Sequence, residues 1–435
     1  MRVLIATHGS RSYLYSMVPL AWALRAAGHE VRVAVPPALV DAAADTGLTV
    51  VAVGEDHRFE EFANLEMAQQ EHDEDDFSLA PDNLRGMLWP DLVWAYDGLV
   101  RNWLKAVNDP MLEDLVLLCR QWGPSLVLWE PTTFAGAVAA EACGAAHARF
   151  LWSVDLLGSS RTYFLERLAE REPHERQDPL REWLSARAES HGARFGEELV
   201  HGRFSITHLP PSLEPSAVAA PESLRLRHIH YGGQTVIPEW LRGTVGDEPE
   251  QEAPKRVLVD WRATAAVGAS ATPVLREVLS GLSTLQDVEV VLVLPEGHGE
   301  KPVDLPGVDR TIEQGALHAL APTCSLAVHA GGFDVLCTAG LHGVPQLVLP
   351  EPGLYDAGLL ADEIVSAGAG STIHREDVEA AAVAKEAARL LEDPAVAHGA
   401  ARLRQEIGAT PTPDRLVERI ERLTAEHTGG GTPAP

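Results

Sequence analysis

The stretch that decides the fold is His329–Ala361, which reads HAGGFDVLCTAGLHGVPQLVLPEPGLYDAGLLA. An apolar run, Leu326–Val328, leads into His329 and two glycines, a helix-like segment follows, and a second apolar run at 345–350 closes the unit. Strand, glycine turn, helix and strand in this order form the βαβ unit of a doubly wound sheet. Ligands bind beyond the carboxyl ends of such strands, where glycines let the backbone approach an anion and the helix N-terminus offers N–H donors. The stretch therefore predicts a ligand site at 329–335.

The same alternation of strands and helices runs through the rest of the chain, which has 435 residues and is too long for one ordinary core. It predicts an α/β fold with two doubly wound domains. The polar segment 243–255 is the expected linker between domain 1–242 and domain 256–426. Packing of the last helices back on the first domain is left open, and 427–435 is expected to be a disordered tail. Strands are predicted before and after this linker at 2–6, 29–35, 48–53, 125–129, 256–260, 288–294, 326–329 and 346–349.

Composition excludes several classes of protein. A net charge of −28 argues against binding to nucleic acid or to an anionic membrane surface. We find no signal peptide and no apolar run of about 20 residues, which indicates a cytoplasmic protein. The cysteines lack metal-site spacing and are predicted to be buried free thiols; they are Cys119, Cys143, Cys324 and Cys337. Four histidines also lack such spacing and are assigned surface or structural roles: His201, His208, His228 and His230.

The central stretch resembles the sugar-nucleotide motif of the GT-B glycosyltransferases of actinobacterial antibiotic pathways. The phrase GVPQLVLP at 343–350 is intact, and His329, Gly331 and Gly332 are present. Further phrases at 17–33, 129–140, 178–184 and 231–241 are similar to the subgroup that attaches deoxysugars from TDP donors to macrolides and other polyketides. The resemblance covers nearly the whole chain, and ancestry alone does not establish activity.

This resemblance implies a GT-B architecture with two Rossmann-like domains facing a central cleft. The acceptor, a small natural-product molecule, would lie on the N-terminal domain and the nucleotide donor on the C-terminal one. A TDP-deoxysugar would be the co-substrate, with no separate cofactor and no metal. Several members of the subgroup need an activator protein, and a homodimer is left open.

The acceptor side departs from the family at its catalytic base. Family members have a histidine fifteen residues before Gly28, and this chain has Tyr13, whose phenol is a poor base at neutral pH. The replacements considered are His8, at the end of the first strand, and Glu130, at the end of the strand 125–129. Tyr13 is interpreted as a catalytic general acid or another polar group of the pocket, or alternatively as an aromatic wall. The residues assigned to acceptor binding are Tyr15, Trp129 and Asp155.

The donor side departs from the family as well. Asp334 stands where the motif has a glycine, and Val335 where it has a hydroxyl residue. After the strand that opens the second domain, Arg262 replaces another glycine while Thr264 keeps the hydroxyl. Asp356 corresponds to the family's aspartate that binds sugar hydroxyls. One extra residue precedes it in this chain. The phrase that flanks the nucleobase has become QGA at 314–316.

The charge of Asp334 bears directly on the donor. Two like charges 4 Å apart repel by about 4 kcal/mol at an effective dielectric near 20, or about three powers of ten in affinity. Arg262 could pair with Asp334 and close the site, or it could bind phosphate itself. Three hypotheses follow: an inverting transferase of a TDP-deoxysugar, a repurposed enzyme that cyclises or dehydrates an intermediate by acid and base groups, and a non-catalytic partner of another transferase.

Overall fold

The chain forms two compact units with different sheets. The computed structural model describes residues 1–57, 79–216, 223–242, 254–262, 271–295, 305–354 and 356–428. The first unit consists of Met1–His208, Ser216–Leu226 and Pro411–Pro435, and the second of Leu209–Pro215 and Arg227–Thr410. The sequence-based boundary at 242 differs from this division, because 227–242 packs with the second unit. Most of the expected linker, 243–253, lies outside the described residues.

The first unit is built on a seven-stranded parallel sheet in the order β3-β2-β1-β4-β5-β6-β7. The strands are β1 Arg2–Ala6, β2 Glu30–Val35, β3 Thr49–Ala52, β4 Leu126–Trp129, β5 Ala146–Leu151, β6 Phe204–Thr207 and β7 Ser223–Arg225. β1 and β4 are buried along nearly their whole length, as expected for central strands covered on both faces. The carboxyl ends of β1, β3 and β4 open toward the same edge of the sheet.

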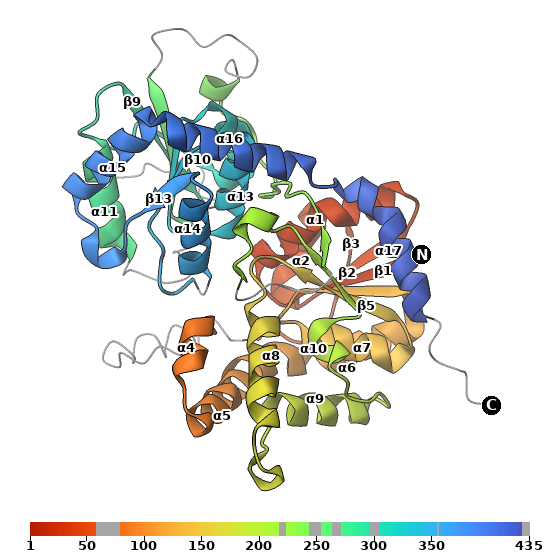
Figure 1. Ribbon diagram of the computed structural model, residues 1–435. Helices are drawn as coiled ribbons and strands as arrows, with labels where there is room; N and C mark the ends of the chain where they lie inside the picture. The colour runs from red at the N-terminus through yellow and green to blue at the C-terminus, as the bar shows by residue number, and fades with distance from the viewer. Residues whose placement is uncertain are drawn as a thin grey trace. The chain divides into compact units, whose positions relative to one another are not determined.

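Helices cover this sheet on both faces (Figure 1). They are α1 Arg11–Ala26, α2 Val40–Asp45, α4 Pro81–Gly86, α5 Trp89–Gly98, α6 Lys105–Trp122, α7 Phe134–Cys143, α8 Leu156–Ala169, α9 Pro179–Ser190, α10 Glu198–His201 and α17 Pro413–Thr428. Asp178 caps α9, as its sequence predicts, because its carboxylate accepts the N–H of Arg181. A hydrophobic core lies between the sheet and helices α6, α7 and α9.

The last helix of the chain belongs to the first unit. α17 lies beside α1 in Figure 1. Its Glu421 carboxylate is 3.0 Å from Nε2 of His29 at the start of β2. Leu416 and Ile420 of α17 are buried, so the helix contributes apolar surface to this unit.

The second unit carries a six-stranded parallel sheet in the order β10-β9-β8-β11-β12-β13. Its strands are β8 Lys255–Asp260, β9 Val288–Leu294, β10 Arg310–Glu313, β11 Leu326–His329, β12 Gln346–Val348 and β13 Gly370–Thr372. Its helices are α11 Ala271–Leu282, α12 Leu317–Leu320, α13 Phe333–His342, α14 Ala357–Ser366, α15 Ala380–Glu392 and α16 Pro394–Ala409. The βαβ unit predicted from the sequence is β11, α13 and β12, and the predicted α/β fold with two parallel sheets is confirmed.

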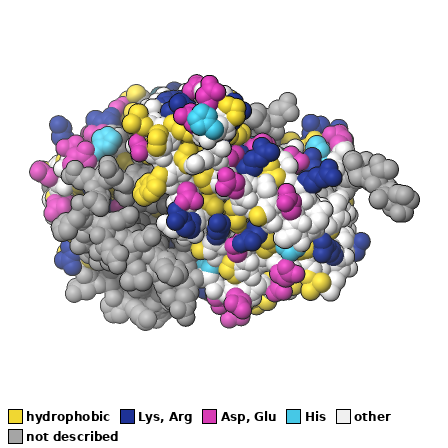
Figure 2. All heavy atoms as spheres, turned by 90° about the horizontal axis from the view of Figure 1, so that it is seen from below, with side chains coloured by type: hydrophobic (Ala, Val, Ile, Leu, Met, Phe, Trp, Pro, Cys, Tyr) yellow, Lys and Arg dark blue, Asp and Glu magenta, His cyan; other side chains and the backbone are white. Residues whose placement is uncertain are grey.

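The surface carries mixed charge. On the face in Figure 2, acidic and basic side chains are interspersed over the described residues, with apolar side chains between them. All four cysteines are free thiols, and Cys119 and Cys337 are buried. Among the described residues, no helix is long and apolar enough to cross a membrane.

Candidate functional site

The glycine loop after β11 has the shape that the sequence predicts for an anion site. Gly331 has φ +94°, a conformation that side chains disfavour, and a Cβ there would lie 2.6 Å from the Cβ of Ala357. Gly332 is the N-cap of α13 and no side chain caps this helix end. The loop therefore presents backbone at the N-terminus of a ten-residue helix.

His329 holds this loop and does not face a ligand. It is fully buried at the end of β11. The N–H of Gly331 donates to its Nδ1 (3.1 Å), so Nε2 carries the proton and donates to Oε1 of Gln346 (2.9 Å). Burial lowers the pKa of His329, although Gln346 and Asp260 act in the other direction. The expectation that His329 contacts the diphosphate is corrected: a neutral imidazole with both nitrogens occupied shapes the turn.

Asp334 lies within reach of three positively charged or chargeable side chains. One of its carboxylate oxygens is 2.8 Å from Nδ1 of His230 and 3.4 Å from Nε2 of His228, and the other is 3.5 Å from Nη2 of Arg262. Burial alone would raise the pKa of Asp334, but the charge of His230 and the hydrogen bonds from both histidines hold it well below its usual value. The carboxylate is therefore ionised, and these neighbours offset its charge, although its side chain is 42 % exposed.

Arg262 is held in place by a second carboxylate. Its Nε donates to both oxygens of Asp260 at 2.9 and 3.0 Å, and its Nη1 donates to Oε1 of Gln314 at 2.9 Å. The carbonyl of Gln314 accepts a hydrogen bond from Nε2 of His230 (2.9 Å). Gln314, from the segment that replaces the nucleobase phrase, thus connects Arg262 and His230, two neighbours of Asp334.

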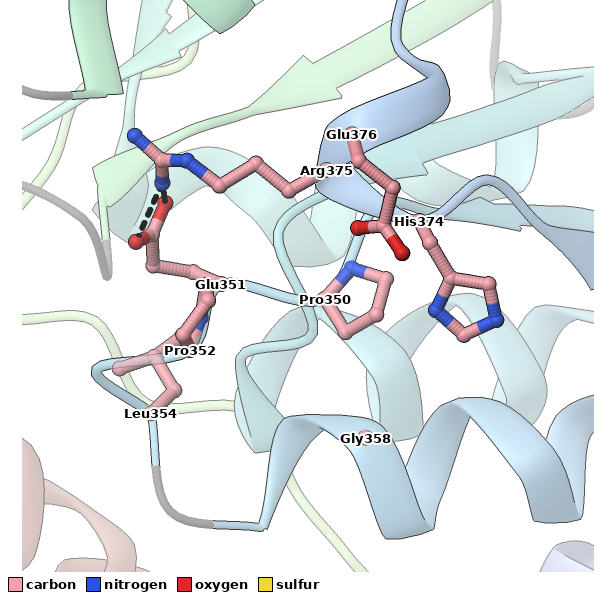
Figure 3. A pocket seen from close by; sticks show the side chains of 8 residues that line it. All are labelled: Pro350, Glu351, Pro352, Leu354, Gly358, His374, Arg375 and Glu376. Atoms are coloured by element: carbon pink, nitrogen blue, oxygen red, sulfur yellow. Dashed lines mark hydrogen bonds and ion pairs between the residues drawn. The ribbon is translucent and has the colours of Figure 1, made fainter. Parts of the chain in front are cut away.

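A cavity of about 270 Å³ lies at the carboxyl ends of β12 and β13, between residues 350–354, residues 374–376 and the first turn of α14 (Figure 3). Arg375 closes one side by donating through Nη1 to both oxygens of Glu351 at 2.7 Å. The N–H of Glu351 donates to the carbonyl of Ala330 in the glycine loop (3.1 Å), which ties the cavity wall to the loop. A Cβ at Gly358 would meet no atom within 4 Å, so the first turn of α14 leaves room here.

Asp356 and Thr264 are the remaining residues predicted to bind the donor. Asp356 is buried at the N-cap of α14, next to the cavity. Thr264 lies outside the described residues. Val335, which stands where the motif has a hydroxyl residue, is buried in a hydrophobic core of the unit.

On the first unit, His8 and Glu130 come together as the sequence suggests. Nε2 of His8 is 3.7 Å from Oε1 of Glu130, and the hydroxyl of Thr132 lies between them, 2.9 Å from His8 and 2.7 Å from Oε2 of Glu130. Thr132 N–H (2.9 Å) and the indole of Trp152 (3.3 Å) also donate to Glu130. Burial raises the pKa of Glu130, and these hydrogen bonds oppose the shift.

Tyr13 forms an aromatic wall beside this cluster. Its ring stacks on Trp152 with centroids 4.7 Å apart and meets the edge of His8 at 5.6 Å. Tyr15, two residues along α1, is 4 % exposed. The aromatic interpretation of Tyr13 therefore has structural support, and acceptor binding by Tyr15 stays a prediction.

Two residues assigned to the acceptor have structural roles instead. Trp129 is fully buried in the core of the first unit, where its indole donates to Nδ1 of His147 (3.2 Å). Asp155 caps α8 and accepts from both terminal nitrogens of Arg149 at 2.9 and 2.6 Å. Strand alternation explains the first correction: Trp129 points into the core, and the next residue, Glu130, reaches the sheet edge.

Sequence reasoning missed several side chains that the structure adds. His57, after β3, places Nε2 3.3 Å from Nδ1 of His8, and Trp152 follows β5. His228 and His230, for which surface or structural roles were expected, both contact Asp334. A position just after a strand was the available signal for His57 and Trp152, because these strands are parallel.

The buried His8 predicts a pH dependence of stability. Burial, followed by the charge of His57, lowers the pKa of His8 from 6.5 to about 3. The unfolded chain then binds a proton that the folded one does not, so stability present above pH 6.5 is lost as pH falls toward 3. We expect the native chain to lose about 2 kcal/mol more than His8→Gln between pH 7.5 and 5 in urea unfolding. The control His174→Gln removes an exposed histidine and should keep the full loss; equal losses in all three proteins would contradict the prediction.

Comparisons with known proteins agree over the whole chain. Residues 22–260 match the model of the erythromycin biosynthesis protein CIII-like N-terminal domain, and residues 276–423 match the corresponding C-terminal domain. The chain is 38 % identical to 10-deoxymethynolide desosaminyltransferase of Streptomyces venezuelae, over 98 % of both chains. It is 36 % identical to erythronolide mycarosyltransferase of Saccharopolyspora erythraea, over 99 % of this chain and 100 % of the relative.

Solved structures give the same result for the fold. Glycosyltransferase VinC in complex with dTDP matches with a TM-score of 0.82 at 32 % identity, covering 98 % of this chain and 100 % of VinC. The spinosyn forosaminyltransferase SpnP matches with a TM-score of 0.77 at 32 % identity, covering 98 % and 99 %. Within the described residues, no group of three or more His, Cys, Asp or Glu side chains could hold a metal ion.

Proposed function

Because the chain belongs to the erythromycin biosynthesis protein CIII-like family of glycosyltransferases, we propose that it transfers a deoxysugar from a TDP-sugar to a hydroxyl of a polyketide-type acceptor. The transfer inverts the configuration at C1 of the sugar. The observation that carries the proposal is the glycine loop and open helix end at the carboxyl ends of the parallel strands, with the guanidinium of Arg262 beside it.

The reaction is a single displacement. The acceptor oxygen attacks C1 and forms the new C–O bond, while the bond from C1 to the diphosphate breaks and TDP leaves with its electron pair. The proton of the acceptor hydroxyl goes to a base of the first unit, where His8 and Glu130 lie together. We assign the base to these residues, since Tyr13 has the family histidine's position and its ring stacks on Trp152.

The donor is proposed to lie along the glycine loop of the second unit. Backbone N–H groups at the start of α13 would bind phosphate oxygens, and the guanidinium of Arg262 would offset their charge. The sugar would occupy the cavity between Glu351 and α14, close to Asp356. Asp334 opposes this arrangement by charge, but His228, His230 and Arg262 compensate it within the protein.

Calorimetric titration with TDP tests the donor site. We expect saturable binding in the micromolar range, because the loop and Arg262 supply an anion site, and no binding of thymidine, which lacks phosphates. The same protein is then given a TDP-deoxysugar and a macrolide aglycone, with and without an auxiliary protein of such a pathway, and the product is followed by mass spectrometry. No heat from TDP at millimolar concentration would contradict the proposed donor site.

One observation favours a second candidate function. Asp334 is paired on both oxygens by side chains of its own unit, an arrangement that satisfies the loop without a phosphate. The second candidate is an enzyme that acts on a natural-product intermediate by acid and base groups around Glu130 and His8, without a sugar nucleotide. Conversion of a polyketide intermediate by the protein alone, combined with no TDP binding, would support it over sugar transfer.

A further inference from the structure

A buried asparagine of α6 reaches the loop between β4 and α7. Asn108 is 1 % exposed, and its Nδ2 donates to the carbonyls of Leu104 in its own helix and of Thr132 in the loop, both at 2.8 Å. Its Oδ1 accepts the N–H of Ala135 in the first turn of α7 (2.9 Å). Two carbonyls and one N–H fix the orientation of the amide, and its nitrogen and its oxygen are both hydrogen-bonded.

The contact with Ala135 replaces the usual cap of α7. Thr133 is the N-cap residue of this helix, a position where a threonine hydroxyl commonly accepts an N–H of the first turn. The hydroxyl of Thr133 makes no such bond, and the N–H of Ala135 goes to Asn108. Thr133 instead uses its hydroxyl on the other side of the loop, where it accepts the N–H of His8 (3.0 Å) and donates to Oε1 of Glu130.

The second threonine of the loop is held at its backbone. The carbonyl of Thr132 accepts from Asn108, and its N–H donates to Oε2 of Glu130 (2.9 Å). The hydroxyl of Thr132 lies 2.7 Å from the same carboxylate oxygen and 2.9 Å from Nε2 of His8. Both threonines and Glu130 are fully buried. The donors around this carboxylate therefore depend on where the loop is held.

The helix that carries Asn108 is itself fixed by α9. The next residue, Asp109, accepts from Nε and Nη2 of Arg187 at 2.8 and 2.6 Å and from the indole of Trp183 (3.1 Å). A π-helical turn, Leu99–Leu104, directly precedes α6, and such turns are frequent at functional sites. α6 is thus a firm support, and Asn108 connects it to the loop.

We propose that Asn108 is a positioning residue of the transfer reaction: it holds the two threonines of this loop in the place where their donors bind Glu130 beside His8. The inference rests on the proposed sugar transfer and on the assignment of the base to His8 and Glu130. Asn108 acts through the threonines and takes no part in the proton transfer. Loss of donors to a buried carboxylate favours its uncharged form, so a protein without Asn108 should have a less effective base.

Kinetics of sugar transfer test this role. Asn108→Leu keeps the size of the side chain and removes its hydrogen bonds. We expect it to lower kcat by about 10- to 100-fold, because small displacements of a base are costly, and to leave the KM for the TDP-sugar within about twofold of the native value. Asn108→Ala should lose less, because a water molecule can enter the vacated space and bind the same groups. The matched control is Leu115→Ala: Leu115 is fully buried on α6, its truncation weakens the packing of the same helix, and kcat should stay near the native value.

A second measurement needs no sugar donor. Titration of the Glu130 carboxyl group is followed by infrared difference spectroscopy, and Glu130→Gln identifies its band. We expect the midpoint in Asn108→Leu to lie about one pH unit above that of the native chain, and the midpoint in Leu115→Ala to be unchanged. In the described part of the chain, the titratable groups in contact with this cluster are His8, 3.7 Å from Glu130, and His57 and Tyr13 beside His8; the variants keep all three.

The two measurements separate the possible failures. If the native chain transfers sugar, and Asn108→Leu equals Leu115→Ala in kcat and in the Glu130 midpoint, the role of Asn108 is overturned. If the native chain transfers no sugar but Asn108→Leu raises the midpoint, the positioning is supported and the proposed sugar transfer is overturned instead. If Asn108→Leu does not fold, Asn108→Ala takes its place, with a smaller shift expected in the same direction.

Discussion

Replacing Asp334 with asparagine is expected to tighten the binding of TDP by about ten- to a hundredfold. The carboxylate stands in the first turn of α13, where the family motif has a glycine, and its charge opposes a diphosphate at the same helix end. Full repulsion at 4 Å would be worth about three powers of ten in affinity. We expect less, because the Asp334 side chain is 42 % exposed and solvent screens its charge. Asparagine also releases Arg262 and His230 toward the phosphates.

Calorimetry with TDP at low and high salt measures this effect. The matched control is Asp362→Asn, which removes one exposed carboxylate from α14 of the same unit and so changes the net charge equally. The control should bind TDP as the native chain does, and the gain from Asp334→Asn should shrink at high salt. Weaker TDP binding after Asp334→Asn would contradict the prediction and would mean that this carboxylate holds Arg262 and the histidines in the arrangement that binds TDP.

Replacing Arg161 with methionine is expected to destabilise the first unit by about 3–5 kcal/mol. The Arg161 side chain is fully buried on α8 and binds two carboxylates. Its Nη1 and Nη2 donate to Asp178 at 2.7 and 2.8 Å, and its Nε and Nη2 donate to Glu197 at 3.0 and 2.7 Å. Methionine fills the space but leaves Asp178, which caps α9, buried without its cation. An uncompensated buried charge costs several kcal/mol.

Urea unfolding followed by tryptophan fluorescence reports this loss, because most of the tryptophans lie in the first unit. Arg101→Met is the control: Arg101 pairs with Asp97 one helical turn away, its side chain is 61 % exposed, and its removal should cost less than about 1 kcal/mol. Similar midpoints for the two variants would show that the buried ion network contributes little. TDP binding, which we propose for the second unit, should survive in folded Arg161→Met.

Local sequence patterns predicted the central strands because burial on both faces gives them continuous apolar runs. β1, β9 and β11 match their predicted residues closely. β5 was not predicted, because His147 and Arg149 interrupt its apolar pattern; both are buried and paired, which only the fold makes acceptable. The short edge strand β7 carries too few residues for a periodic signal.

The site was predictable where its residues directly follow strands that are adjacent in the sheet. The glycine loop, and the approach of Arg262 to Asp334 at the ends of adjacent strands β8 and β11, follow from the parallel order of a doubly wound sheet. The histidines at 228 and 230 could not be placed, because they come from an irregular segment more than a hundred residues away from Asp334. His57 was missed for another reason: its contact with His8 depends on the absence of a side chain at Gly9.

The position of α17 has a consequence for synthesis on the ribosome. The chain leaves the first unit after His208 and Leu226 and returns to it only at Pro411, so the second unit is inserted within the first. Chain growth is vectorial, and the apolar residues of α1 that meet α17 stay uncovered until residues 413–428 have been synthesised. The second unit can therefore complete its fold before the first, and a chain cut off before Pro413 would have an unfinished first unit.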